Sequence, residues 1–153
     1  DGFPAHLLTE WWDLCLERIY WDRGAKQERV LERSSAWLTT DGCQCRYVYS
    51  EMCWLPVEMP PWLKNLTETV CQKCGIVDRP NSCNLNLYND GSEFIGWHYD
   101  DEPLLDSVKN DALIISLSLG ASRWFELRAA DDPEGLHEKV LLESGDICTM
   151  EGL

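Results

Sequence analysis

The first stretch of the chain places apolar residues three and four positions apart, a spacing that predicts an amphipathic α-helix. Thr9 can cap this helix, and Asp22-Arg23-Gly24 marks an end near Trp21. The apolar stripe consists of Trp11, Trp12, Cys15 and Ile19. A helix with one such stripe packs on a sheet, so these tryptophans are assigned to packing rather than to a cofactor.

A second helix is predicted to begin after Met59-Pro60-Pro61, because proline is tolerated in the first turn of a helix. Trp62, Leu66 and Val70 form its expected buried stripe, and Gly75 is placed to end it. We assign this helix to the scaffold.

Short strands separated by turns dominate from Ser82 onward. The expected strands are Cys83–Tyr88, Phe94–His98, Ala112–Leu119, Arg123–Arg128, Lys139–Leu142 and Ile147–Met150. Earlier in the chain, Asp41-Gly42 has the composition of a hairpin turn, and Cys45–Ser50 after it alternates as a strand. Many short strands without helices between them favour a double-sheet jelly roll over a parallel sheet. The sequence therefore predicts an α+β, mainly β fold, with a double-stranded β-helix core and two buttressing N-terminal helices.

Composition places the chain among folded globular proteins. It has 153 residues, of which 44% are hydrophobic and 26% charged, and these values fit a single domain with a sizeable core. No apolar run approaches the roughly 18 residues of a membrane span, and no signal peptide opens the chain. We therefore expect a monomer in the nucleus or cytoplasm, with no membrane partner. The chain begins with Asp1 rather than methionine, which indicates a fragment or a processed product, so an organelle-targeting segment upstream stays open.

Charge and cysteine usage restrict the partners. The net charge of −14, from 27 acidic and 13 basic residues, argues against indiscriminate binding to a polyanionic backbone, although a local basic surface is compatible with it. Eight unevenly spaced cysteines in a chain of this length indicate reduced thiols rather than a disulfide framework. Cys43-x-Cys45 and Cys71-x-x-Cys74 together leave a four-cysteine zinc site as a less favoured alternative.

The most informative residues are His98 and Asp100, which are separated by one residue and follow the apolar run Phe94-Ile95-Gly96-Trp97. Side chains at i and i+2 of an extended chain point to the same side, so an imidazole and a carboxylate can converge there. This pair is two thirds of the 2-His-1-carboxylate triad that binds Fe(II) and leaves positions open for a cosubstrate and oxygen. Alone, the pair also fits a solvated polar turn, and the surrounding residues decide between the two.

Further motifs flank this pair in a fixed order. Asn86-x-Tyr88-x-Asp90-Gly91 precedes it, Asp101-Glu102 follows directly, and Ser118-Leu119-Gly120-x-x-Arg123-x-Phe125 comes next. The last element is Ser144-Gly145-Asp146-Ile147-Cys148-Thr149-Met150. The series resembles the AlkB family of iron- and 2-oxoglutarate-dependent dioxygenases, which oxidatively dealkylate nucleic-acid bases. The resemblance is close over residues 84–153 and looser over residues 60–75.

The resemblance implies a metal site and a cosubstrate site. His98 and Asp100 would ligate Fe(II). Asn86 and Tyr88 would donate hydrogen bonds to 2-oxoglutarate, whose carboxylates need buried donors. Arg123 would face the acidic ligand region and hold Asp100 by a charge-assisted hydrogen bond.

Substrate recognition is the second role that the resemblance assigns. Arg46, Tyr47 and Tyr49 would form a lid over an extruded base, since a flipped base needs flat partners for stacking and donors for its phosphates. Asp101 and Glu102 would accept hydrogen bonds from the exocyclic amine of that base. For the lid segment, an ordinary strand whose tyrosines pack on the sheet is the alternative.

The family pattern continues beyond the point at which this chain stops. After the glycine-aspartate strand and its methionine, family members carry a second iron histidine, and then an arginine that pairs the distal carboxylate of 2-oxoglutarate. This chain ends at Glu151-Gly152-Leu153. His6 and His137 do not match the missing position and are expected to be surface residues.

The resulting prediction is one AlkB-like domain over residues 1–153, incomplete at its C-terminus. Residues 1–80 would hold the helices and the nucleotide-recognition lid, and residues 81–153 the jelly-roll core. Its reaction would be the oxidative demethylation of N-alkylated bases in DNA or RNA, as in DNA repair, with single strands preferred because base extrusion is then nearly free. Two alternatives remain: an oxygenase of the same family that acts on protein side chains, and a jelly-roll binding module without catalysis.

Overall fold

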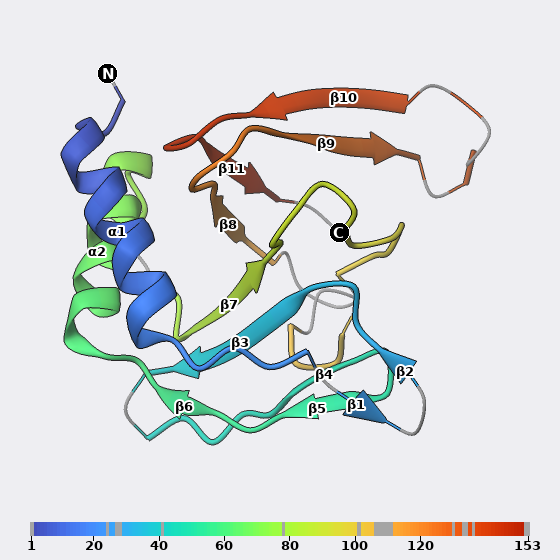
Figure 1. Ribbon diagram of the computed structural model, residues 1–153, viewed down its shortest axis with the longest axis horizontal. Coiled ribbons are helices and arrows are strands. Elements are labelled where there is room, and N and C mark those ends of the chain that lie inside the picture. Colours follow the sequence, from blue (N-terminus) through green and yellow to red (C-terminus); the bar gives the residue numbers. More distant parts are fainter. Residues whose placement is uncertain are drawn as a thin grey trace. The chain divides into compact units, whose positions relative to one another are not determined.

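The computed structural model describes residues 2–23, 25–26, 29–40, 42–77, 79–100, 102–105, 112–129, 131–132, 135 and 137–151. These residues form two helices, α1 (Ala5–Arg18) and α2 (Pro61–Cys74), and a series of short strands (Figure 1). The strands are β1 (Ala25–Lys26), β2 (Arg29–Val30), β3 (Ser34–Thr39), β4 (Tyr47–Tyr49), β5 (Met52–Trp54), β6 (Val57–Glu58), β7 (Ser82–Leu87), β8 (Ile114–Leu117), β9 (Arg123–Arg128), β10 (His137–Leu142) and β11 (Ile147–Met150). This content confirms the α+β, mainly β class.

The described residues group into two compact units, and each is considered by itself. The first consists of the chain up to Arg18 together with Ile114–Met150, and so contains α1 and β8 to β11. The second runs from Ile19 to Leu113, with the residues from Glu151, and contains β1 to β7 and α2.

In the second unit, β3 is the central strand of a three-stranded sheet in the order β6-β3-β7 (Figure 1). It pairs parallel with β6 and antiparallel with β7, and every residue from Ser34 to Thr39 is buried. Several of these residues are polar, so their hydroxyl groups need partners inside the protein. Thr39 Oγ1 donates to the carbonyl oxygen of Cys43 at 3.1 Å, and Ser35 Oγ donates to Asn86 Oδ1 at 2.9 Å.

The register between β3 and β7 determines which side chains share a face. Ser35 pairs with Asn86, and Ser34 pairs with Leu87. Because side chains alternate along a strand, Arg33 and Ser35 point to the same side as Asn86. Continuing the register by one residue places Tyr88 opposite Arg33. One face of this strand pair therefore gathers four polar side chains at one end.

The same face of β3 also carries the core of this unit. Trp37 forms a buried cluster with Tyr47, Met52 and Trp54 of the antiparallel β4–β5 hairpin. Trp37 Nε1 donates to the carbonyl oxygen of Cys45 at 2.8 Å, which fixes the chain just before β4. The hairpin is thus packed beside the polar end of β3 and β7.

Helix α2 begins and ends where the sequence predicts. Pro60 is its extended N-cap residue, and Gly75 ends it in the left-handed conformation with φ of 70°. Leu66 and Val70 are buried as expected, together with Leu63 and Cys71. The predicted stripe is wrong at Trp62, which is only half-buried, because the buried side is centred one residue further along, at Leu63.

Helix α1 of the first unit starts earlier than predicted. The backbone N–H groups of Leu7 and Leu8 donate to the carbonyl oxygen of Pro4, so the helix begins at Ala5 and Thr9 is not its cap. Thr9 Oγ1 instead donates back to the carbonyl oxygen of Ala5 at 3.1 Å, as hydroxyls inside helices do. Trp11 and Cys15 are buried, as the stripe predicts, whereas the helix ends at Arg18 and excludes Ile19.

Two glycine turns seat α1 on the strands of the first unit. Gly120 has φ of +87°, and a Cβ added there would lie 2.8 Å from the Trp12 ring. Gly145 has φ of +95°, and a Cβ added there would lie 3.0 Å from Leu8. Glycine is required at both turns because a side chain would be strained and would displace the helix. The glycines of the two C-terminal motifs therefore serve packing.

The remaining strands of the first unit form two antiparallel pairs, β8 with β11 and β9 with β10. Strands β9 and β11 have the predicted bounds, and β7, β8 and β10 lie within two residues of prediction. Phe94–His98 is not a strand, since none of it joins a ladder in the described part of the chain. Phe94 and Trp97 are 53% and 47% exposed, so no neighbouring strand covers this apolar run.

The hairpin expected at Asp41-Gly42 also differs from the structure. Gly42 has the positive φ of 83° that a turn allows, whereas Asp41 lies outside the described residues. The strands on either side do not pair with each other, because β3 pairs with β6 and β7 while β4 pairs with β5. The residue composition therefore predicted a turn at this place, but it did not predict which strands pair with β3 and β4.

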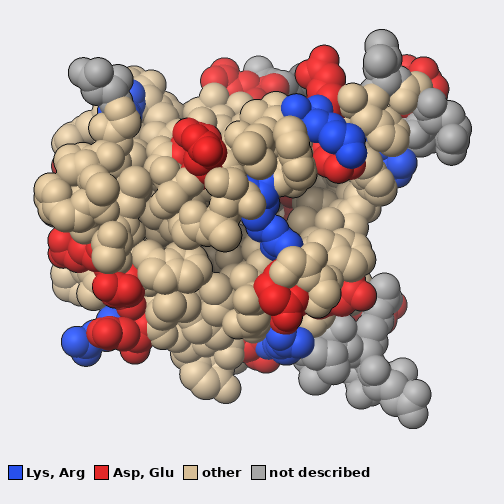
Figure 2. Space-filling view, turned by 45° about the horizontal axis from the view of Figure 1, so that its top comes forward, with Lys and Arg blue, Asp and Glu red and all other residues tan. Residues whose placement is uncertain are grey.

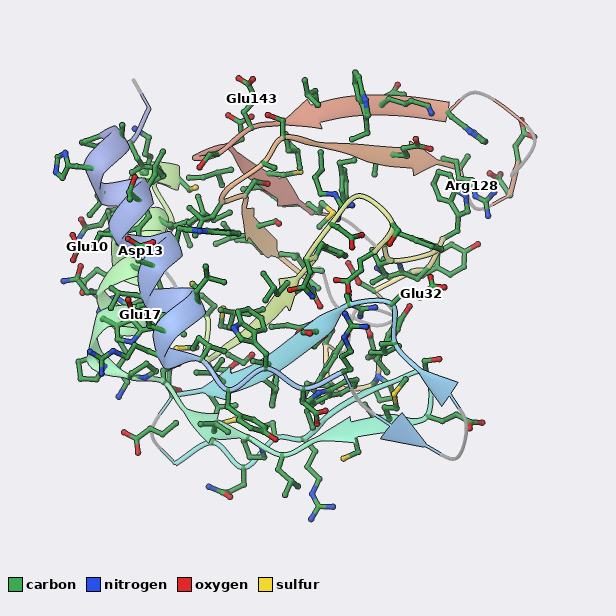
Figure 3. The ribbon with its side chains drawn as sticks, in the orientation of Figure 1. Glu10, Asp13, Glu17, Glu32, Arg128 and Glu143 are labelled. Atoms are coloured by element: carbon green, nitrogen blue, oxygen red, sulfur yellow. The ribbon has the colours of Figure 1, made fainter. Side chains whose placement is uncertain are left out.

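Acidic side chains line the exposed side of α1. Glu10, Asp13 and Glu17 are exposed and follow one another along the helix (Figure 3). On the face shown in Figure 2, basic side chains occur in small groups beside acidic ones. This distribution agrees with the expectation that broad binding to a phosphate backbone is disfavoured.

All eight cysteines are free thiols. No three histidine, cysteine or acidic side chains come together to hold a metal within the described residues. The four-cysteine zinc alternative is therefore wrong, since all four of its cysteines are described. Neither of the described helices is long and apolar enough to cross a membrane.

Candidate active site

His98 and Asp100 lie next to each other in the segment that follows β7. His98 Nε2 is 3.5 Å from Asp100 Oδ1, and both side chains are partly open to solvent. The segment joins no ladder among the described residues, so the two side chains come together outside a strand. The expected proximity of the two side chains is present.

The second ring nitrogen of His98 fixes the orientation of the imidazole. Nδ1 lies 2.8 Å from the carbonyl oxygen of Gly96. Because a carbonyl only accepts, Nδ1 carries a proton in the neutral and in the protonated ring. Nε2–H of the protonated ring donates to Asp100, whereas Nε2 of the neutral ring has a lone pair that a metal can bind. A hydrogen bond with Asp100 raises the pKa of His98, while burial opposes this shift. A backbone acceptor at the distal nitrogen is typical of histidines that bind metals.

This arrangement fits two positions of an Fe(II) facial triad. An imidazole nitrogen and a carboxylate oxygen directed at one another are ligand types that suit Fe(II). Within the described residues no further histidine, cysteine or acid joins them.

Asn86 on β7 is held by two donors from the neighbouring strand. Arg33 Nε donates to Asn86 Oδ1 at 2.7 Å, and Ser35 Oγ donates to the same oxygen at 2.9 Å. Two donors at one oxygen fix the amide orientation and direct Nδ2 away from β3. Asn86 is exposed, and none of the described residues accepts a hydrogen bond from Nδ2. This amide can therefore donate to a bound carboxylate, as predicted for the cosubstrate.

Arg33 is a site residue that the sequence did not identify. It is 2% exposed, and its guanidinium carbon lies 5.0 Å from the centre of the Tyr49 ring. Among the described residues, no carboxylate forms an ion pair with it. A buried guanidinium is stabilised by a nearby anion, so a carboxylate bound beside Arg33 would be favourable. The sequence feature that could have identified Arg33 is its position two residues before Ser35, which places it on the face of β3 that meets Asn86.

Tyr47 and Tyr49 belong to a row of aromatic rings. Tyr47 stacks on Trp37 with ring centroids 5.2 Å apart, and it lies parallel to Tyr49 at 6.5 Å. Tyr49 meets the His98 ring edge-on at 6.0 Å. Tyr47 is 8% exposed, which agrees with the packed-strand alternative for this residue, whereas Tyr49 is half-buried. A stacking face beside His98 is therefore available from Tyr49, with Tyr47 behind it.

Glu102 is held by the buried hydroxyl of Tyr47. Tyr47 Oη donates to Glu102 Oε1 at 3.1 Å. Burial, followed by the charge of Glu102, raises the pKa of Tyr47, so this phenol remains a donor at neutral pH. The other oxygen, Oε2, is buried and has no hydrogen-bond partner among the described residues. A buried acceptor without a donor is unfavourable, so Oε2 marks a position at which a bound donor would be stabilised.

The other predicted residues are distributed around the chain. Arg46 is exposed directly before β4, and Asp101 lies outside the described residues. Arg123 is the half-buried first residue of β9 in the first unit, so its bond to Asp100 stays a prediction. His6 and His137 are exposed, which confirms that they are surface residues.

Comparison with known sequences identifies the family. A sequence model of the 2OG-Fe(II) oxygenase superfamily matches residues 9–153. The chain belongs to this superfamily. Its members use Fe(II) and 2-oxoglutarate, and the ligand pair and the open amide of Asn86 fit these two groups.

Within the superfamily the oxygenase is AlkB-like. The rat protein named alpha-ketoglutarate-dependent dioxygenase alkB homolog 3 is 32% identical to it over 167 aligned residues, which cover 98% of this chain and 53% of the rat protein. The human protein of the same name is 29% identical over 164 residues, covering 98% and 55%. The mouse protein is 39% identical over 79 residues, covering 47% and 27%. This chain spans about half the length of the rat and human relatives.

Proposed function

We propose that this oxygenase oxidatively removes alkyl groups from the ring nitrogens of bases in DNA or RNA, as repair demethylases do. One observation supports the proposal most. His98 and Asp100 lie together, and Oε2 of Glu102, two residues further on, is buried with no hydrogen-bond partner among the described residues. The first two side chains suit a metal, and the third suits the amine of a base. A segment of five residues thus combines metal ligands with an acceptor for a base.

The side chains around this segment have distinct tasks in the proposed reaction. Iron and 2-oxoglutarate, when bound, supply the activation of oxygen that converts an N-methyl group into formaldehyde. His98 and Asp100 hold the metal, with the imidazole kept in the required tautomer by Gly96. Asn86 and Tyr88 donate to the carboxylates of 2-oxoglutarate.

Arg33 supports the cosubstrate in two ways. It orients the Asn86 amide through Nε, and its buried positive charge lies on the same strand face. A dicarboxylate bound there would provide the anion that the described residues do not provide. The cosubstrate site would thus be built from both strands, β3 and β7.

The substrate would be a base turned out of a single strand. The ring of Tyr49 offers a stacking face, and exposed Arg46 offers a donor for phosphate. A net charge of −14 limits the number of phosphate contacts, so the affinity should fall only gently as salt rises. Single strands are preferred because no base pair has to be broken.

We also propose that the two units belong to one AlkB-like domain with a jelly-roll core, which acts as a monomer. Asp101 would provide a second acceptor for the base. The antiparallel pairing of β8 with β11 and of β9 with β10 supports a core of this kind.

A comparison of substrates tests the proposed function. The protein at its full natural length, with Fe(II) and 2-oxoglutarate, should release formaldehyde from single-stranded oligonucleotides that contain 1-methyladenine or 3-methylcytosine. Turnover should be slower on the matching duplexes, because the base must first be unpaired. A methylated peptide serves as the competing substrate. Turnover on the peptide alone would replace the proposal with a protein oxygenase, and binding of oligonucleotide without any turnover would replace it with a binding module.

Replacing Asn86 by alanine should weaken 2-oxoglutarate binding while leaving the fold intact. The variant removes a donor to a charged acceptor, a loss of about 1.5–3 kcal/mol, or roughly 10- to 150-fold in the dissociation constant. Asn84→Ala is the matched control, because Asn84 is also exposed and lies on the same face of β7. Titration calorimetry measures the dissociation constant for 2-oxoglutarate in the two variants. Equal losses in the two variants, or no loss in either, would remove Asn86 from the cosubstrate site.

A further inference from the structure

Glu93 is a buried acid in an otherwise open loop. It is 8% exposed, whereas residues 89–92 before it and Phe94 after it are all exposed. The loop runs from the end of β7, which carries Asn86, to His98, and it contains no strand or helix. A carboxylate is seldom buried unless its charge is compensated, so its partners indicate what it does.

The first set of partners closes the loop on itself. The backbone N–H of Asn89 donates to Glu93 Oε2 at 2.7 Å, and Asn89 Nδ2 donates to the two carboxylate oxygens at 3.0 and 3.2 Å. Asp90 Oδ1 accepts from the backbone N–H of Ser92 at 2.7 Å and from its hydroxyl at 2.6 Å. The hydrogen bond from the Asn89 backbone, with the charge of Arg23, lowers the pKa of Glu93 despite its burial, so the carboxylate is ionised.

The second partner ties the loop to a distant part of the chain. The guanidinium of Arg23, 70 residues away in sequence, forms an ion pair with Glu93. The backbone around Arg23 is itself fixed, because its carbonyl accepts from the N–H of Leu31 at 3.2 Å. Asp22, its neighbour, exchanges two backbone hydrogen bonds with Ser35, at 2.7 and 3.0 Å.

These bonds form one continuous connection across the site. Ser35 holds Asn86 on one side and is bridged to Asp22 on the other, and Arg23 then reaches Glu93. Glu93 is five residues before His98 in the chain. Without this connection, the segment from Asn89 to Trp97 would have no ladder and few buried side chains to hold it, and such segments open readily.

We propose that Glu93 is a positioning residue, which fixes His98 and Asp100 relative to the cosubstrate face of β3 and β7 by bonding Asn89 and Arg23 together. It touches neither the metal nor the substrate. It acts by limiting the conformations of the loop, so that the ligands are already in place when the metal arrives. This inference rests on the proposed function for the identity of the site, but the restraint on the loop is independent of it.

Two measurements on the protein at its full natural length test the role of Glu93. Hydrogen exchange of the backbone amides in residues 89–97 reports the restraint directly, and Co(II) titration followed by its visible absorption reports the metal site. We expect Glu93→Ala to speed exchange in this segment about tenfold or more, and to weaken Co(II) binding about 10- to 100-fold, as the loss of an outer-sphere partner does. Glu93→Gln should retain part of the protection from exchange and part of the Co(II) affinity, because an amide oxygen can still accept from the Asn89 N–H.

The control is the ion pair between Arg79 and Glu68, whose Nη2 and Oε1 atoms are 2.7 Å apart. It lies in the same unit, and Glu68 belongs to α2. Glu68→Ala should change neither measurement. Unchanged exchange in residues 89–97 of folded Glu93→Ala, or faster exchange with unchanged Co(II) affinity, would overturn the positioning role. If Glu93→Ala does not fold, Glu93→Gln and Arg23→Ala carry the same test. Should the unaltered protein bind no Co(II), the proposed function fails, and exchange alone then decides whether Glu93 restrains the loop.

Discussion

Replacing His98 by alanine is expected to abolish turnover and most of the metal affinity, with little change in the fold. In the proposed site the imidazole supplies Nε2 to the metal. The ring is partly exposed, so its removal creates no large core cavity. Loss of an outer-sphere partner of a metal ligand costs about 10- to 100-fold, and loss of a ligand itself should exceed that. Co(II) titration and formaldehyde release, with circular dichroism to check the fold, measure these effects.

The chain supplies its own controls for this experiment. It contains three histidines, and His6 and His137 are both exposed. His6→Ala and His137→Ala should leave metal binding and turnover within twofold, about 0.4 kcal/mol, of the unaltered protein. Tight Co(II) binding that survives in His98→Ala would show that the metal lies elsewhere, and loss of binding in His137→Ala would make that residue the missing ligand.

Local patterns predicted the elements whose cause is local. Gly75 ends α2 because a glycine can adopt the left-handed conformation there, and the same information is visible in the sequence. Strands β9 and β11 have their predicted bounds for a similar reason, since alternation and turn residues act within a few positions. Helix α1 shows the limit of this reasoning, because Thr9 has the composition of a cap but Pro4 provides the accepting carbonyl.

The site residues that the sequence missed depend on distant contacts. Arg33 and Asn86 are 53 residues apart, and Arg23 and Glu93 are 70 residues apart. In the sequence Arg33 belongs to a polar stretch and Glu93 to a turn, and in both cases an exposed side chain is the ordinary expectation. Arg33 lies beside the paired strands β3 and β7, and Glu93 pairs with Arg23; no local pattern specifies either contact.

Two separate arguments pointed to His98 and Asp100: the motifs shared with the AlkB family, and the alternation of side chains on an expected strand. The strand argument required Phe94–His98 to be a paired strand, and this segment joins no ladder within the described residues. The two side chains nevertheless lie 3.5 Å apart. Motif spacing therefore predicted that these two side chains lie together even where the secondary structure was predicted wrongly.

Changing Glu102 to glutamine is expected to alter which methylated bases the enzyme accepts. Oε1 is occupied by the Tyr47 hydroxyl, so Oε2 is the oxygen that can meet a base. Adenine and cytosine present an amine donor beside the methylated nitrogen, whereas guanine and thymine present a carbonyl at that place. The Oε2 acceptor should therefore favour 1-methyladenine and 3-methylcytosine over 1-methylguanine and 3-methylthymine.

In Glu102→Gln the buried group carries an NH₂ that can donate, so the preference should shift toward the two bases with a carbonyl. Leaving a buried donor or acceptor unpaired costs about 1–3 kcal/mol, and the ratio of kcat/KM between the two classes should fall roughly 5- to 150-fold. Tyr47→Phe should shift the ratio less, because it frees Oε1 without adding a donor. Glu126→Gln, in an exposed pair with Lys139 on β9 and β10, is the control.

The experiment compares kcat/KM on the four methylated bases within each variant. Co(II) and 2-oxoglutarate affinities should be unchanged in Glu102→Gln, since the residue contacts neither group in the proposed site. A uniform loss on all four bases, together with weaker metal binding, would mean that Glu102 only holds the β4 hairpin through Tyr47. An unchanged ratio with full activity would mean that the buried oxygen does not meet the base, and the acceptor would then have to be sought at another residue.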